Sequence, residues 1–450
     1  MNQPPSPPRP PSFFYGWVVL AVSSVALAAT SPGQSWVVGL FTLEISESLG
    51  LKESTIALCY GIATFAAAFP LLYVGTLADR FGPRIIMGTS ALALGLGCVL
   101  IGFAAGPISL GVCYFILRFA GQGALGLSSS HSVAMWFERR LGFANGLKAQ
   151  SMPLAILIAP LGINAAIAAL GWGTAYALLG VLVWVAVLPL VVFLHRNRPA
   201  DIGQFVDGET PPIPAPTAAS HAPHARPEEE LIAALAVEQP PAEELIEPHD
   251  PPAPDEPNFT RTEALCAPAF WIVTGSLVLS ALIGTAIVFL VAPILEAAGR
   301  PITDAPRVLA ALGITSAIAT PLAGILTDRY PGSIIIVLAN ALLALASACL
   351  AMSALPWLAE IALATLGFSQ ALIFIGGTTI VARFFGRPHH GAIRSAQTFF
   401  MVAGTSVGPV LTTSLAEATG YRWALLILGV SCLPGVIAGC FLRTPRTPRR

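Results

Sequence analysis

Several side chains that can do chemistry lie inside long apolar runs of this sequence, where a polar group is costly and therefore indicates a function. Arg118 lies within the run 110–137. At 100° per residue, three polar residues fall within about 40° of it on a helix: Gln122, Ser129 and Ser132. A guanidinium group on such a face can bind an anionic substrate through two hydrogen bonds. Alternatively, Arg118 bonds backbone carbonyls and stabilises helix packing. We predict that Arg118 and Gln122 bind substrate.

Two more titratable side chains lie in apolar runs. His131 can titrate near neutral pH and is a candidate proton site; the alternative is a histidine that packs and hydrogen-bonds. It lies about 140° around the helix from Arg118, so the two side chains cannot both point squarely into one cavity. Lys148 lies about 12 Å into the run 141–170. Its ammonium group either binds substrate or reaches the cytoplasmic surface of the membrane.

Other chemistry is poorly represented in these runs. No Asp or Glu lies deep in any of them, which disfavours proton coupling through a buried carboxylate. The seven cysteines are scattered without a C-x-x-C pair, and we interpret them as small apolar side chains. We therefore expect no metal, no cofactor and no enzymatic activity.

Composition indicates the solvent in which these runs fold. Of the 450 residues, 10% are charged and 55% are hydrophobic, and the mean hydropathy is +0.75. Soluble domains carry about 25% charged residues, so the composition excludes a soluble enzyme. A net charge of −1 and a pI near 6.7 exclude a nucleic-acid binder that acts through a basic face. The lipid bilayer is the expected environment.

Apolar runs long enough to cross a bilayer predict the fold class. A span takes about 20 apolar residues, and the sequence holds twelve such runs. They are 13–41, 55–77, 85–105, 110–137, 141–170, 172–194, 264–295, 308–326, 334–353, 358–384, 393–415 and 423–442. We predict an all-α polytopic membrane protein with twelve transmembrane helices.

Charge divides the chain into regions and orients it. Residues 201–260 hold 13 acidic residues and one arginine in a Pro- and Ala-rich stretch, which indicates a flexible linker. Most arginines flank one side of the spans, which places both termini and the linker in the cytoplasm. The predicted regions are a disordered N-terminus 1–12, a six-helix bundle 13–198, an acidic linker 199–262, a second six-helix bundle 263–442 and a basic tail 443–450.

The two halves resemble each other at an offset near 249 residues. The segment 75–81 corresponds to 324–330 in the second half, and Ala149-Gln150-Ser151 corresponds to Ala396-Gln397-Thr398. Two parallel repeats of six spans are typical of transporters. Symmetry predicts that the amides of Gln150 and Gln397 face a central cavity and bind substrate, or else hydrogen-bond between helices. Trp36 lines the same cavity or marks the aromatic belt of the membrane.

These motifs also carry a family resemblance. Gly75-x-Leu-Ala-Asp79-Arg80-x-Gly82-x-Arg84 resembles the loop motif between spans two and three of the major facilitator superfamily, and 324–330 resembles a degenerate copy. Within that superfamily, three segments look like the monocarboxylate and oxalate/formate porter branch: Tyr15-Gly16-Trp17, 136–142 and 198–203. The resemblance implies the major facilitator fold, in which two pseudo-symmetric bundles rock about a central site.

The resemblance also implies roles and a substrate class. It assigns gating to five residues at one end of the bundles, which are Asp79, Arg80, Arg84, Asp328 and Arg329. Relatives that carry carboxylates commonly have two cations where this sequence has Thr320 and Gln397, so an oxalate-type two-cation site does not carry over. One central arginine with amides and hydroxyls suits a monoanion or a neutral polar solute.

We therefore expect a monomeric secondary active transporter in the plasma (inner) membrane. It moves a small organic solute, such as a monocarboxylate, by alternating access, as proton symport or exchange. The alternatives are efflux of drug-like compounds by the same fold and a transporter-like membrane sensor, which binds ligand without flux.

The loop motif generates a first prediction. The carboxylate of Asp79 can face the positive N-terminus of a neighbouring helix in one transport state. Asp79→Asn should therefore slow transport while protein abundance, measured by immunoblot of membranes, stays similar. Unchanged transport would contradict the gating role.

Overall fold

The computed structural model describes residues 13–208, 259–355, 357–386 and 390–445. All of them belong to one compact unit, Pro11–Gly208 with Pro257–Arg450. The predicted N-terminus 1–12, most of the acidic linker and residues 446–450 of the tail lie outside the described residues.

The first half consists of helices that follow one another with short connections. They are α1 Gly16–Ala28, α2 Ser35–Leu49, α3 Glu53–Phe81, α4 Pro83–Ile101, α5 Pro107–Ile116, α6 Gly126–Trp136, α7 Leu141–Ala149, α8 Ser151–Leu170 and α9 Trp172–Pro189. The π-helical segments η2 Leu117–Leu125 and η3 Leu190–Leu194 join α5 to α6 and extend α9.

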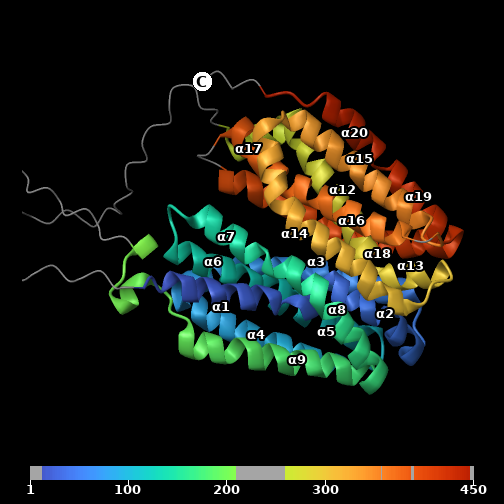
Figure 1. Cartoon of the computed structure of the whole chain (residues 1–450), viewed down its shortest axis with the longest axis horizontal. Helices are drawn as coiled ribbons and strands as arrows, with labels where there is room; N and C mark the ends of the chain where they lie inside the picture. Colours follow the sequence, from blue (N-terminus) through green and yellow to red (C-terminus); the bar gives the residue numbers. More distant parts are fainter. Residues whose placement is uncertain (1–12, 209–258, 356, 387–389, 446–450) are drawn as a thin grey trace, which may run out of the picture. The chain divides into compact units, whose positions relative to one another are not determined.

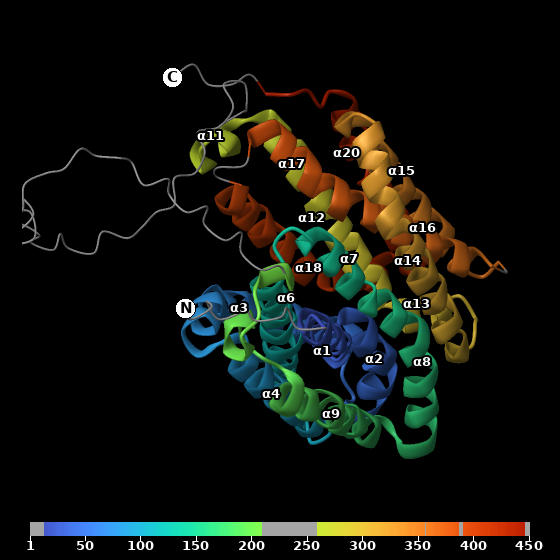
Figure 2. The same cartoon turned by 60° about the vertical axis from the view of Figure 1, so that its left-hand side comes forward.

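The second half repeats this plan. It begins with the short α11 Arg261–Cys266 and continues with α12 Pro268–Phe289, α13 Val291–Ala297, α14 Ala305–Arg329, α15 Gly332–Ala351, α16 Leu358–Ala371, α17 Gly377–Phe385, α18 His390–Thr419, α19 Tyr421–Val430 and α20 Leu433–Cys440. The π-helical segment η7 Leu372–Gly376 joins α16 to α17. Joined across these breaks, the described helices form twelve segments long and apolar enough to cross a membrane, which confirms the predicted class. Figure 1 and Figure 2 show the helices of each half grouped together.

Interruptions of the helices fall at equivalent places in the two halves. The π-helical segments η2 and η7 lie in the middle of the fourth and tenth spans, about one repeat length apart. π-helical turns are rare and frequently occur at functional sites. The first span is broken by a 3-10 turn at Ser31–Gly33, where Pro32 cannot donate a helical hydrogen bond.

Three glycines lie where the backbones of the two halves come close together. A Cβ atom on Gly39 of α2 would lie 2.5 Å from the carbonyl oxygen of Phe289, at the end of α12. Equivalent atoms would lie 2.6 Å from the oxygen of Ser406 at Gly61, and 2.8 Å from the oxygen of Pro153 at Gly313. These glycines join α2 to α12, α3 to α18 and α14 to α8, so the backbones of the halves pack directly on one another.

The contacts between halves define two different ends of the helix set. The loop motif and its second copy lie where α3 and α14 end, and we call this the motif end. We call the other end of the helices the opposite end. At the opposite end Tyr421 donates a hydrogen bond to Glu53 of the other half, beside a pocket of about 350 Å³ lined by residues of both halves. At the motif end, Arg84 and Arg383 bond to groups of their own halves. The described structure is therefore latched at the opposite end.

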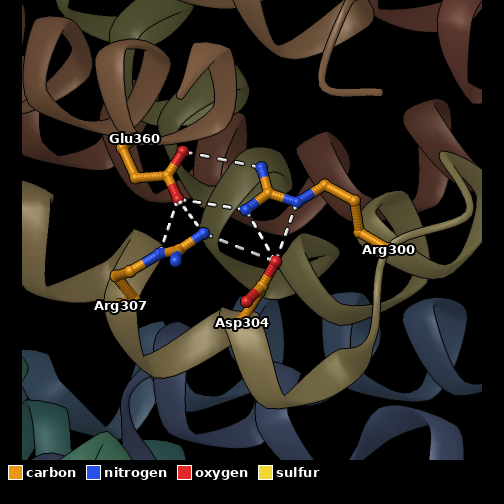
Figure 3. Close-up of polar contacts among 4 residues, drawn as sticks. All are labelled: Arg300, Asp304, Arg307 and Glu360. Carbon is orange, nitrogen blue, oxygen red and sulfur yellow. Dashed lines mark hydrogen bonds and ion pairs between the residues drawn. The ribbon is translucent and has the colours of Figure 1, made fainter. Parts of the chain in front are cut away.

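A charged network holds the second half together at the opposite end (Figure 3). Arg300 follows α13 and bonds both Asp304, at 2.7 Å, and Glu360 of α16, at 3.0 Å. Arg307 of α14 reaches the same Glu360 carboxylate at 2.8 Å. Each charge has an opposite partner, so the connection between the seventh and eighth spans is tied to the start of the tenth. This connection includes α13, which packs on α2 of the other half.

Residues at the start of the predicted linker make hydrogen bonds to the first half. Asp207 accepts hydrogen bonds from the backbone N–H groups of Glu138 and Arg139, at 3.1 and 2.7 Å. Gln204 bonds the backbone of Phe13 and Tyr15 at the start of the first span. These side chains satisfy N–H groups that helices leave unpaired, so residues 199–208 pack on the motif end.

Residues at the other end of the predicted linker make contacts with the second half. The N–H of Phe259 bonds the carbonyl of Phe385, at 3.1 Å, and Thr260 caps α11. Two of the segments that resemble the porter branch contact the end of the sixth span, where Tyr15 donates to the carbonyl of Leu194 and Trp136 donates to that of Arg196.

Gly39 provides a test of the close approach between halves. A valine side chain there would collide with carbonyl groups of Val288 and Phe289, so Gly39→Val should hold the opposite end apart. Thr413, 1% exposed, lines the pocket between the halves, and a cysteine replacing it in a cysteine-free background reports opening. We expect severalfold faster labelling of that cysteine by a membrane-impermeant maleimide.

The matched control is Gly162→Val, because a Cβ on Gly162 of α8 meets nothing within 4 Å. It should leave the labelling rate unchanged. Equal rates in both glycine variants would show that the backbone contact at Gly39 does not set closure.

Candidate functional site

A cavity of about 560 Å³ lies between the two halves. It is bounded by α3 on one side, by η2 and α6 on the second and by α18 on the third. The lining residues are Phe65, Ala68, Phe69, Leu71, Gln122, Gly123, Gly126, Leu127, Ser130, Thr398, Phe399 and Val402. Most of these residues are apolar, and the polar side chains among them are an amide and two hydroxyls, those of Gln122, Ser130 and Thr398.

A buried ammonium group lies one hydrogen bond behind this wall. Lys148 of α7 is 4% exposed, and its Nζ donates to the Oγ of Ser130 at 2.6 Å. Ser130 in turn donates to the carbonyl of Gly126, so its hydroxyl oxygen is oriented to accept from the lysine. Among the described residues no carboxylate lies within ion-pair distance of Lys148. A buried charge without a counter-charge is costly, and an anion in the cavity would offset that cost.

Arg118 lies in the core of the first half and does not line the cavity. It is 5% exposed, its Nη1 donates to the carbonyl of Gly33 at 3.0 Å, and its guanidinium lies 5.0 Å from the centre of the Tyr60 ring. Gln122 is exposed and lines the cavity. Arg118 and Gln122 both lie in the π-helical segment η2, and of the two only Gln122 lines the cavity.

The paired amides also have different surroundings. Gln397 is fully buried, donates to the Oγ1 of Thr274 at 3.1 Å and accepts from Arg394 at 3.2 Å. Gln150 is partly exposed at the junction of α7 and α8. Trp36 is 4% exposed in α2. None of these three is among the described residues that line the cavity. Thr398, which follows Gln397 in the sequence, does line it.

The predicted gating residues lie together at the motif end of each half. Arg84 bonds the carbonyls of Val191 and Val192, and the carboxylate of Asp328 pairs with Arg383 at 2.8 Å. Arg80 is exposed with its guanidinium 5.4 Å from the Phe81 ring centre, and Arg329 is exposed. The backbone of Asp79 lies in α3, and its side chain lies outside the described set.

The two histidines near this end occupy different sites. His131 lines a second pocket, of about 300 Å³, together with Arg80, Arg198 and Asp201, and not the main cavity. His195, at the end of the sixth span, is fully buried and bonds the hydroxyl of Ser132. Sequence reasoning passed over His195 and Ser130, since neither residue type by itself marks a site. The described residues contain no group of three or more His, Cys, Asp or Glu side chains able to hold a metal ion.

Sequence comparison identifies relatives of this chain. The family model of the Major Facilitator Superfamily matches residues 18–313 and 273–450. A probable sulfoacetate transporter of Cupriavidus necator is 30% identical over 137 residues, which cover 30% of this chain and 32% of that protein. Monocarboxylate transporter 3 of Mus musculus is 30% identical over 156 residues, which cover 34% and 31% of the two chains. The matched segments thus span about a third of the length of these relatives.

Solved structures show the same fold. A bacterial homologue of the human lysosomal transporter Spinster, in an inward-facing and unoccupied conformation, aligns with a TM-score of 0.67 at 15% identity. The alignment covers 95% of this chain and 97% of that chain. The predicted fold of two six-helix bundles is therefore confirmed.

His195 gives this end of the molecule a pH dependence. Burial, together with the charges of Arg84 and Arg196, lowers the pKa of His195 to about 4, from about 6.5 in an unfolded chain. The folded state therefore binds fewer protons between these values, and the stability present above pH 6.5 is lost as the pH falls towards 4. The full loss is at most about 3 kcal/mol.

Thermal unfolding of the purified protein in nanodiscs at pH 7.5, 6.0 and 5.0 measures this effect. The melting temperature should decrease as the pH is lowered. The decrease should be smaller in His195→Gln, whose side chain does not titrate. Parallel pH profiles for the two proteins would contradict a buried neutral histidine.

Proposed function

Because the chain belongs to the Major Facilitator Superfamily and is a transporter of small solutes, we propose that its solute is an organic monoanion, a monocarboxylate or a related acid. Transport proceeds by alternating access, as proton symport or exchange. The cavity between the halves holds the solute while the opposite end is latched. Closure of the motif end and opening of the opposite end complete the cycle.

The buried ammonium of Lys148 carries this proposal. A cation that is 4% exposed, with a neutral hydroxyl as its partner, leaves a positive potential at the cavity wall. Ser130 and Gln122 supply hydrogen-bonding groups beside it, which suits one carboxylate. The names of two relatives support an acid as solute, since one is called a probable sulfoacetate transporter and the other a monocarboxylate transporter.

Arg118 is proposed as a second cation for the solute in another transport state. Its partners, the carbonyl of Gly33 and the ring of Tyr60, are neutral, so an anion can replace them without separating an ion pair. Gly33 lies in the break of the first span, where the backbone is not held in a continuous helix. Gln150, Gln397 and Trp36 remain predicted solute contacts for that state, and His131 remains a candidate proton site.

The motif end is proposed to face the cytoplasm of a monomer in the plasma membrane. Arg80, Arg84, Asp328 and Arg329 lie there, and they would latch the halves when this end closes. Asp79 belongs to the same proposal. The excess of arginine on this side of the spans supports the orientation.

Efflux of drug-like compounds is the second candidate function. The apolar wall formed by Phe65, Phe69, Leu127 and Phe399 favours it. The charge on Lys148 separates the two candidates, because an ammonium group repels a lipophilic cation and attracts a carboxylate. A sensor of the same fold would bind the acid and show no flux in proteoliposomes.

Removal of the ammonium group tests the proposal. In a thermal-shift screen of the purified protein, monocarboxylates should stabilise the wild type, and Lys148→Met should lose most of that stabilisation, with at least a tenfold rise in Kd. The chain offers a matched control in Lys52, an exposed lysine at the opposite end. Lys52→Met should bind as the wild type does.

Two outcomes would contradict the proposal. Stabilisation by lipophilic cations and not by carboxylates would favour efflux. Carboxylate binding that is equal in Lys148→Met and the wild type would remove Lys148 from the site.

A further inference from the structure

The cavity is much larger than a short acid requires. Its volume of about 560 Å³ falls in the range of pockets that hold drug-sized ligands, about 300–1,000 Å³. A two- or three-carbon carboxylate at Lys148 would leave most of this volume without contacts. The dimensions therefore favour a larger solute.

Two of the three polar side chains among the lining residues lie in the first half, and the third, Thr398, adjoins Phe399 on α18. Gln122 and Ser130, with Lys148 behind it, lie on η2, α6 and α7 of the first half. The aromatic residues Phe65 and Phe69 come from α3, and Phe399 comes from α18. An acid group near Lys148 would thus leave the rest of the solute against aromatic rings contributed by both halves.

A second pocket extends the aromatic part of the wall. It has a volume of about 440 Å³, lies along the seam between α3 and α18, and shares Phe65 and Phe69 with the main cavity. The two rings pack edge to face, with centroids 5.4 Å apart at 87°. Phe65 is 40% exposed and Phe69 is 55% exposed, so both rings have room to turn. They form a partition between the main cavity and the seam.

Contacts of this seam support an apolar occupant. Beyond the two rings its wall consists of Leu58, Ile62, Val407 and Val410 with few polar groups. Gly61 brings the backbone of α3 close to Ser406 of α18 and closes the seam towards the opposite end. An apolar chain that passes the phenylalanine rings would therefore meet hydrocarbon side chains on both helices.

We propose that the cavity selects an amphipathic monoanion, a carboxylate with an aryl group or an alkyl chain of about six to eight carbons. The acid lies at Ser130 and Lys148, and the apolar group packs on Phe65, Phe69 and Phe399 and extends towards the seam. Phe69 acts as a specificity-determining residue, since its ring borders both spaces. This inference rests on the proposed function and names the substrate class of the same site.

Binding of a graded series of acids tests it. Acetate, butyrate, hexanoate, octanoate and phenylacetate are titrated into the full-length protein in nanodiscs, with Lys148→Met as the reference for partition into lipid. Each buried methylene should lower the Kd about fourfold until the cavity is filled. Phe69→Ala should reduce this dependence on length, with hexanoate and octanoate each losing about tenfold and acetate unchanged. Phe103→Ala is the control, because Phe103 is 79% exposed and lies outside the cavity.

The outcomes separate this inference from the proposed function. Equal affinity along the series, with binding still dependent on Lys148, would overturn the amphipathic class and leave the monoanion in place. A dependence on length that Phe69→Ala does not alter would overturn the role of the aromatic wall. Failure of every acid, short or long, to bind would remove the proposed function as well.

Discussion

The direct packing of backbone on backbone at Gly39, Gly61 and Gly313 is the constraint on which the rest of the structure depends. Because no side chains separate the halves there, α2, α3 and α14 are fixed against α12, α18 and α8 at van der Waals distance. The hydrogen bond from Tyr421 to Glu53 and the packing of α13 on α2 also join the two halves. The cavity lies elsewhere along the interface, between α3, α6 and α18. Larger side chains line it there, among them Phe65 and Phe399.

The two halves share a fold but differ in the partners of their charged side chains. In the second half, Arg300, Arg307, Asp304 and Glu360 satisfy one another, so this network rigidifies the opposite end. In the first half, Lys148 and Arg118 are buried beside neutral groups. Symmetric backbones therefore carry different arrangements of charge, with an ion-pair network at the opposite end of the second half and two buried cations beside neutral groups in the first.

The sequence predicts the parts of this fold that depend on composition, and misses those that depend on local geometry. Span positions follow from hydropathy because the bilayer fixes their length, and the loop motif at 75–84 identifies the family. Periodicity does not indicate the π-helical segment that holds Arg118 and Gln122, nor that only Gln122 lines the cavity. The hydrogen bond from Lys148 to Ser130, 18 residues away, depends on the packing of α7 on α6, which the sequence does not indicate.

We propose that an organic anion in the cavity couples the two ends of the molecule. The most direct test uses pulsed electron paramagnetic resonance on cysteine-free protein carrying spin-label pairs across the halves, one at Phe143 and Tyr330 for the motif end and one at Ile108 and Leu355 for the opposite end, all exposed positions. Addition of a monocarboxylate should shorten the first distance and lengthen the second in the same fraction of molecules. Distances that stay constant, or that change at one end alone, would contradict the central claim.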